Sequence, residues 1–295
     1  MTLRRLGRKL YPLMTTRKMI INADDFGLCE GVNRAVYEAH TRGVLTSTTI
    51  MANMPAVDEA IAIARKTPSL GMGVHLNATE GRPLSSGGVL VGEDGEFKYS
   101  AYTLAMKSLV DKKVLKALEI ELAAQIESII DKGIVPTHLD SHKHFHCFGP
   151  IYRIVCSLAE RFGIRAIRWP WEPATVGYGD WPRVGGFGDK MRAMLLRYLT
   201  LNCQKIDSRF IKNDIFFGVL HTGRIDDKFW AEIGKTQFEG VAEVMTHPGY
   251  PNGLTHTRLV KEREAELKWL CDAGTKKILG EAGIELVHYG NIDGK

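Results

Sequence analysis

Residues 19–51, MIINADDFGLCEGVNRAVYEAHTRGVLTSTTIM, decide the fold class of this chain of 295 residues. The apolar run at 19–21 has the composition of a buried strand, and a second such run lies at 44–51. Between them, residues 32–37 have the apolar spacing of a helix. A strand, a helix and another strand in so short a segment are typical of a parallel α/β sheet.

The same alternation continues toward the C-terminus. Further strands are predicted at 70–76, 136–139, 166–169, 215–220, 241–245 and 284–287, and further helices at 57–64, 104–132 (one helix or two), 150–162 and 258–279. Seven or eight strands favour a (β/α) barrel over an open sheet. Residues 173–213 fit the alternation poorly, so we expect them to be an insertion over one rim of a single α/β domain, with two domains as the alternative.

Composition excludes several classes of protein. Hydrophobic residues make up 44% of the chain and charged residues 25%, as in ordinary globular proteins. No run of eighteen apolar residues occurs, and the N-terminus lacks the apolar centre of a signal peptide, so a soluble cytoplasmic protein is expected. The five cysteines form no CxxC pair, which argues against both disulfides and a thiolate zinc site.

Positive charge is concentrated at the N-terminus. The formal net charge is +5, and six cations precede the first carboxylate, Asp24. Residues 1–17 therefore form a basic leader, which is either a solvated tail or a contact with anionic lipid headgroups. The basic, apolar residues 190–205 would suit an interfacial helix, so peripheral membrane contact on the cytoplasmic face is a second expectation. Neither segment has the aromatic residues of a nucleic-acid surface, and no nucleic-acid partner is expected.

Histidines are concentrated in Thr137-His138-Leu139-Asp140-Ser141-His142-Lys143-His144-Phe145-His146, directly after a predicted strand. Imidazole is the commonest protein ligand for a transition metal, so this density predicts a metal site at the strand end. In an extended segment, His142, His144 and His146 would share one face. We expect one or two of them to bind the ion and the others to line a pocket.

Other predicted strands end in polar residues as well. Asp24 and Asp25 follow the first strand, His75 and Asn77 end the third, Arg168 ends another, and His247 precedes the turn Pro248-Gly249. The carboxyl ends of parallel strands meet at one edge, so these side chains should converge. Adjacent residues of a strand face opposite ways; one carboxylate should therefore bind a cation, and its neighbour, at a turn, should reach that ion's water. The set suits metal-assisted hydrolysis.

Four motifs, in order along the chain, resemble the signatures of the YdjC/ChbG/HpnK carbohydrate deacetylases. They are Asn22-Ala23-Asp24-Asp25-Phe26-Gly27, Gly73-Val74-His75-Leu76, the histidine segment 137–146 and Thr246-His247-Pro248-Gly249. The resemblance extends from about residue 18 to residue 290, and the first three motifs together are highly specific. Segments 168–173 and 214–218 are more similar to the hopanoid-associated HpnK branch than to the chitooligosaccharide branch.

The resemblance implies a distorted (β/α) TIM-like barrel over residues 18–290, one divalent metal ion, and removal of an acetyl group from an N-acetylated amino sugar. By motif, Asp25, His75 and His142 would hold the metal. Asp24 would be the general base, with Arg168 orienting it, and His247 the general acid. His144, His146 and Asn77 would line the sugar pocket.

Several alternatives remain open from the sequence. Two imidazoles and one carboxylate favour Zn²⁺, whereas the resemblance implies Mg²⁺. The substrate could be a glycolipid or a soluble oligosaccharide. The rivals to a deacetylase are a metal-dependent phosphoesterase and a glycolipid-binding protein without catalysis. For the deacetylase, Asp24 must be ionised and His247 protonated at the working pH, which predicts a bell-shaped rate profile.

Overall fold

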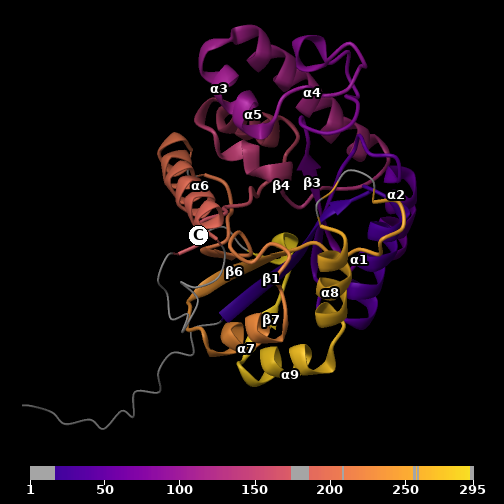
Figure 1. Ribbon diagram of the computed structural model, residues 1–295, viewed down its shortest axis with the longest axis vertical. Coiled ribbons are helices and arrows are strands. Elements are labelled where there is room, and N and C mark those ends of the chain that lie inside the picture. The colour runs from indigo at the N-terminus through magenta and orange to yellow at the C-terminus, as the bar shows by residue number, and fades with distance from the viewer. Residues whose placement is uncertain (1–16, 174–185, 208, 255–256, 258, 293–295) are drawn as a thin grey trace, which may run out of the picture.

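The computed structural model describes residues 17–173, 186–207, 209–254, 257 and 259–292. At its centre is a sheet of seven parallel strands surrounded by helices (Figure 1). The strands are β1 (Arg17–Phe26), β2 (Ser47–Ile50), β3 (Gly71–Leu76), β4 (Leu139–Ser141), β5 (Ile215–Phe217), β6 (Gly240–Thr246) and β7 (Ile284–Leu286). The helices are α1 (Glu30–Arg42), α2 (Val57–Lys66), α3 (Ala101–Val110), α4 (Lys112–Asp131), α5 (Gly149–Arg161), α6 (Phe187–Ile206), α7 (Asp227–Lys235), α8 (Lys261–Leu270) and α9 (Ala273–Glu281).

β1 is the central strand, and its residues are buried from Met19 to Phe26. Burial on both faces explains why its first half is a continuous apolar run. The strand order is β4-β3-β2-β1-β6-β5, with β7 paired to the first residues of β1. Asn22 pairs with Ser47 of β2 on one side and with Met245 of β6 on the other. All the strands are parallel, so their carboxyl ends lie along one edge of the sheet.

The sheet is curled, and this confirms the predicted distorted α/β barrel class. Between β4 and β5, however, the ladder shrinks to two isolated bridges, Leu139 with Ile167 and Ala166 with Ile211. The predicted strand at 166–169 is therefore wrong as a full strand. One further hydrogen bond joins this segment to β5: the Phe216 amide donates to the Trp171 carbonyl at 3.1 Å.

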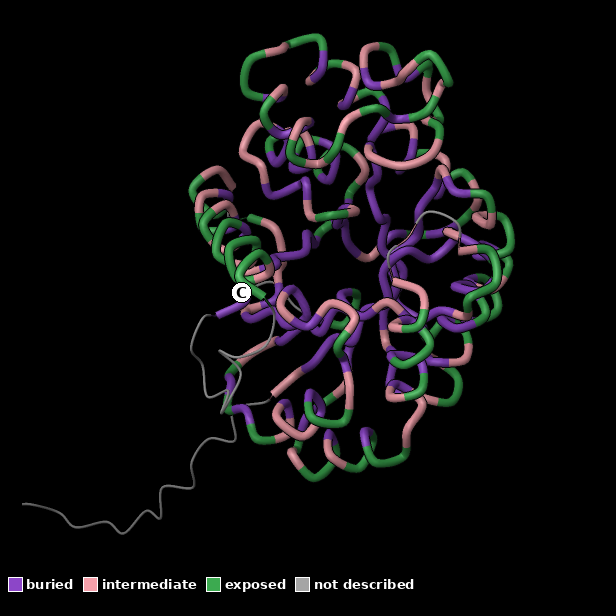
Figure 2. Tube along the Cα trace, viewed as in Figure 1, coloured by how far each residue is buried: buried purple, intermediate pink, exposed green. Residues whose placement is uncertain are grey.

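The helices pack outside the sheet, and their buried faces supply the core (Figure 2). In α4 the buried positions include Leu118, Leu122, Ile126 and Ile129, as the periodicity predicts, and Asp111 caps the helix. Two of the predicted helical segments are each divided. Residues 104–132 fall into α3 and α4, and the single helix predicted at 258–279 is two, because Asp272 caps a new one.

Some expectations fall on residues outside the description. Residues 1–16 of the leader and 174–185 of the insertion are not described, whereas Arg17 belongs to β1 and most of the remaining insertion is α6. All five cysteines are free thiols, and four of them are buried. No helix in the described ranges is both long and apolar enough to cross a bilayer.

Candidate metal centre and active site

A cavity of ≈ 680 Å³ opens at the carboxyl ends of the strands. Its lining includes six of the predicted site residues, from four separate segments: Asp24, Asp25, His75, His142, His144 and His247. They follow or end β1, β3, β4 and β6. The parallel sheet thus brings these residues together at one edge, as the strand-end pattern predicts.

Asp25 ends the regular part of β1 with a left-handed backbone, at φ 67°. Aspartate tolerates this conformation better than most side chains. The turn interrupts the alternation of the strand, so both Asp24 and Asp25 line the cavity. His75 Nε2 lies 4.0 Å from Asp24 Oδ2 and 3.5 Å from Asp25 Oδ1.

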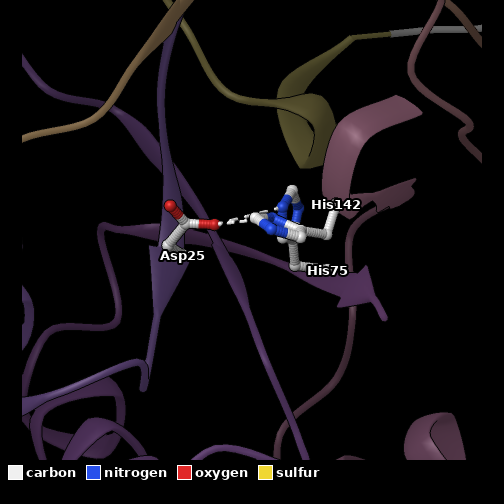
Figure 3. A group of neighbouring side chains, drawn as sticks. All are labelled: Asp25, His75 and His142. Carbon is white, nitrogen blue, oxygen red and sulfur yellow. Dashed lines mark hydrogen bonds and ion pairs between the residues drawn. The ribbon is translucent and has the colours of Figure 1, made fainter. Parts of the chain in front are cut away.

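Asp25, His75 and His142 form one cluster (Figure 3). Asp25 Oδ1 lies 3.1 Å from His142 Nδ1 and 3.5 Å from His75 Nε2, and the three donor atoms all lie within 4.8 Å of one another. Asp24, His75 and Asp140 meet the same distance limit, but Arg168 binds both of those carboxylates. The first set therefore fits a cation better.

Each histidine of the cluster is backed by a carboxylate on its far nitrogen. His75 Nδ1 forms a hydrogen bond with Asp140 Oδ1 at 2.7 Å. His142 Nε2 lies 3.2 Å from Glu80 Oε1, as an ion pair without hydrogen-bond geometry. Backing of this kind fixes the tautomer and orientation of metal-binding imidazoles. The bond to Asp140 leaves His75 Nε2 directed toward Asp25, and His142 Nδ1 lies 3.1 Å from the same carboxylate. The chemistry and geometry of the donors therefore fit a divalent cation.

The carboxylates around the cluster create a negative potential, which favours a bound cation. Burial lowers the pKa of His75, but Asp140 and Asp24 more than offset it and raise the pKa to about 10. Burial raises the pKa of Asp25, while Arg263 and His142 outweigh that effect and hold it well below its usual range. Without metal the site is thus an ionised carboxylate beside protonated imidazole.

Arg168 is fully buried and holds Asp24 with two parallel hydrogen bonds. Its Nη1 donates to Oδ2 at 2.8 Å and its Nη2 to Oδ1 at 2.7 Å. Burial raises the pKa of Asp24, but the charges of Arg168 and His75 lower it below its usual range. Glu243 and Asp140 also bind the guanidinium, at 2.8 and 2.5 Å. Asp24 is therefore ionised and fixed in orientation.

His247 follows β6 and lines the cavity. Its amide donates to Glu266 Oε2 at 2.5 Å, whereas its buried Nδ1 has no hydrogen-bond partner within the described residues. Burial lowers the pKa of His247 to about 4. Burial therefore disfavours the protonated form of His247 in the free protein, and its role as the general acid stays a prediction.

The histidine segment is not extended, contrary to the prediction. Residues His142–Cys147 form a 3-10 turn in which Lys143 and His144 have positive φ. His142 and His144 consequently line the cavity, but His146 does not. Its Nδ1 lies 2.6 Å from Ser141 Oγ and its Nε2 lies 3.2 Å from the Arg168 carbonyl, behind the wall.

Asn77 also lies outside the cavity lining, in contrast to its expected place in the sugar pocket. It is fully buried, and its Nδ2 donates to the Glu80 carbonyl at 2.7 Å and to Asn53 Oδ1 at 3.1 Å. These bonds shape the loop that carries Glu80. Asn77 thus supports the cavity wall from behind.

Sequence reasoning missed three residues of the site. Arg263 of α8 is buried and donates to Asp25 Oδ2, Glu80 backs His142, and Glu243 holds Arg168. Glu80 follows β3 closely, so the strand-end rule could have found it. Arg263 lies within a helix rich in charged residues and gives no such signal.

Comparisons with known proteins identify the family of this chain. The sequence model of the YdjC-like protein family matches residues 18–281. A carbohydrate deacetylase of Geobacillus stearothermophilus is 33% identical over 276 residues, covering 92% of this chain and 97% of that protein. One of Brevibacillus brevis is 32% identical over 277 residues, covering 93% and 99%.

A solved structure from Enterococcus faecalis, named for cellobiose-phosphate cleavage, superposes with a TM-score of 0.69 at 25% identity. The superposition covers 93% of this chain and 98% of that one. The shared fold and the family match confirm the resemblance drawn from the motifs. This chain belongs to the YdjC-like family.

Proposed function

We propose that this chain is a carbohydrate deacetylase that hydrolyses the acetamide of an N-acetylated amino sugar with the aid of one divalent cation. Its relatives, named carbohydrate deacetylases, support the reaction class. The observation that carries the proposal is the cluster of Asp25, His75 and His142 beside the Asp24–Arg168 pair in one cavity. That pairing puts a cation site next to a fixed, ionised carboxylate.

The cation would be held by Asp25 Oδ1, His75 Nε2 and His142 Nδ1. Three protein ligands leave coordination positions open, as in catalytic sites. Two imidazoles and a carboxylate suit Zn²⁺ better than Mg²⁺, which prefers oxygen ligands. When bound, such an ion polarises the acetyl carbonyl and lowers the pKa of a nearby water.

The residues of the chain supply the proton transfers. Asp24 takes a proton from the attacking water, whose oxygen bonds to the carbonyl carbon. The C–N bond then breaks, the amine nitrogen receives a proton from His247, and acetic acid leaves and ionises to acetate. His247 takes its proton from solvent, and Asp24 returns its proton to solvent after the products leave. Because burial holds the pKa of His247 at about 4, the imidazole must gain its proton in the substrate complex. A negative charge developing on the carbonyl oxygen would raise that pKa.

The rest of the cavity wall indicates the kind of substrate. Phe148, Leu196, Leu199 and Val219 line it with apolar surface. A free amino sugar is polar and would leave this wall unused, whereas an amino sugar linked to an apolar group would cover it. We therefore infer that the sugar carries an apolar aglycone, such as a lipid.

The screen that tests the function is mass spectrometry on metal-loaded protein. N-acetylated glycolipids, chitooligosaccharides and p-nitrophenyl phosphate are each incubated with the protein and with its Asp24→Asn variant. The proposal expects loss of acetyl from an amino sugar, with glycolipids preferred, and little release of nitrophenol. Hydrolysis of the phosphate ester without any deacetylation would contradict it and favour the phosphoesterase.

Metal binding is expected to release protons. Because the pKa of His75 is raised to about 10 in the metal-free protein, its imidazole is protonated at neutral pH and must lose that proton to bind a metal. Zn²⁺ affinity should rise about tenfold per pH unit between roughly pH 7 and 9, below the folded pKa. Calorimetry in buffers of different ionisation enthalpy measures the release; a heat independent of the buffer would oppose this assignment.

Glu80→Gln is expected to weaken metal binding by roughly 10- to 100-fold, the usual cost of removing a carboxylate behind a metal-binding imidazole. The amide lacks the negative charge that pairs with His142 and Lys143, although the side chain keeps its size. Metal titration against a chelator measures the change. Glu119→Gln, on the exposed side of α4, is the matched control and should bind metal like the wild type. Unchanged affinity in Glu80→Gln would show that His142 needs no backing.

A further inference from the structure

α6 has two apolar faces, and only one is buried. Leu196, Thr200 and Cys203 form the buried face. A second line of side chains is 44–83% exposed: Phe187, Met191, Met194, Tyr198 and Leu201. At 3.6 residues per turn, these five positions fall on one stripe on the opposite side of the helix. Figure 2 shows α6 at the rim of the molecule, coloured mostly as exposed.

Cations flank this stripe. Lys190 and Lys205 are exposed, and Arg197 is partly exposed. The single carboxylate of α6, Asp189, lies on the other side of the helix, 3.6 Å from Arg192 and 3.5 Å from Arg224. The stripe itself therefore carries positive charge without a compensating carboxylate of α6.

α3 repeats the arrangement. Leu104, Ala105 and Ser108 are buried. Its other apolar side chains, Tyr102, Met106, Leu109 and Val110, are 47–85% exposed. Three lysines follow at the start of α4, namely Lys112, Lys113 and Lys116.

Both helices border the mouth of the cavity. Tyr102 of α3 and Leu195 of α6 line it, and both are exposed. Tyr102 belongs to the α3 stripe, and Leu195 lies one helical turn from Met191 of the α6 stripe, so exposed apolar side chains of both helices adjoin the opening of the proposed active site. Exposed apolar surface next to cations is the composition of helices that lie in a membrane interface.

We propose that the exposed faces of α3 and α6 dock the protein on an anionic lipid bilayer, with the cavity mouth beside the bilayer surface. The charge of α6 argues against a second copy of this chain as the partner of these exposed faces. α6 carries four cations and one carboxylate, so two such faces would repel each other. Anionic headgroups attract the same cations, and each cation near the surface raises the membrane partition coefficient about fivefold. This docking does not depend on the deacetylase reaction.

Vesicle flotation tests the docking with the full chain. Vesicles of phosphatidylcholine with phosphatidylglycerol are compared with phosphatidylcholine alone. The double variant Met194→Ser/Tyr198→Ser should bind the anionic vesicles at least about tenfold more weakly, because it removes two apolar side chains from the interface. Lys190→Gln/Lys205→Gln should also weaken binding, by about tenfold or more, and should reduce its dependence on salt.

The matched control is Val135→Ser/Tyr37→Ser, which changes an exposed aliphatic residue and an exposed tyrosine on other elements. It should bind like the wild type. None of these six residues lines the cavity, so activity on a soluble substrate should stay unchanged. Circular dichroism checks that each variant is folded. Three results would overturn the proposal. The wild-type protein could fail to bind anionic vesicles, or all variants could bind them equally. The protein could also be a dimer that Met194→Ser/Tyr198→Ser dissociates.

Discussion

Replacing His142 by alanine is expected to abolish both metal binding and deacetylation. A zinc site with four ligands gains about 10–16 kcal/mol, or about 3 kcal/mol for each ligand. Loss of one ligand should therefore weaken binding at least about a hundredfold. After removal of free metal, the variant should hold almost no ion and should retain less than about 1% of turnover.

His142 is a better choice than Asp25 for this experiment. Asp25 pairs with the buried Arg263, so its removal would leave an uncompensated buried charge and could unfold the protein. The His142 side chain is 17% exposed, and its loss leaves Arg263 paired with Asp25 and Lys143 paired with Glu80.

The control for this prediction is His40→Ala. His40 lies in α1 and contacts the Leu45 carbonyl and Ser69 Oγ, away from the cavity. This variant should keep its metal and its activity. Full metal content in His142→Ala, measured by elemental analysis with circular dichroism to verify folding, would remove His142 from the metal site.

Asp24→Asn should have the opposite signature, with metal retained and turnover lost by roughly 10²–10⁴, the usual contribution of a positioned acid or base. The amide has nearly the size of the carboxylate but cannot take the proton of the attacking water. Arg168 keeps two carboxylate partners, Asp140 and Glu243, so the buried charge remains compensated.

Two readouts separate catalysis from structure in this variant. Elemental analysis should give the wild-type metal content, and KM should change much less than kcat, because Asp24 acts mainly in the transition state. Turnover within a factor of about two of the wild type would exclude Asp24 as the base, and loss of the metal would make it a ligand or a structural residue instead.

Much of the fold was predictable because the central strands are buried on both faces. Continuous apolar runs such as 19–21 then mark each strand, and amphipathic segments mark the helices between them. The bridges at 166–167 look like a strand in sequence but pair only at single residues. α7 was missed, although Asp226 caps it and Phe229, Trp230 and Ile233 have helical spacing.

The site was predictable to the extent that it depends on strand ends. Parallel topology brings Asp25, His75 and His142 to one edge without any knowledge of the turns between them. The turn at Lys143 and His144 was not predictable, because lysine rarely adopts positive φ and no glycine or proline marks a turn there. It alone decides that His144 faces the cavity and His146 does not. Arg263 binds Asp25 from helix α8. Helical periodicity predicts the helix but not which distant residue one of its side chains contacts.

An anomalous difference map from crystals soaked with Zn²⁺ tests the proposed metal site most directly. One strong peak is expected about 2.0–2.2 Å from Asp25 Oδ1, His75 Nε2 and His142 Nδ1. A map with no peak among these three atoms, or with the ion bound elsewhere in the cavity, would contradict it.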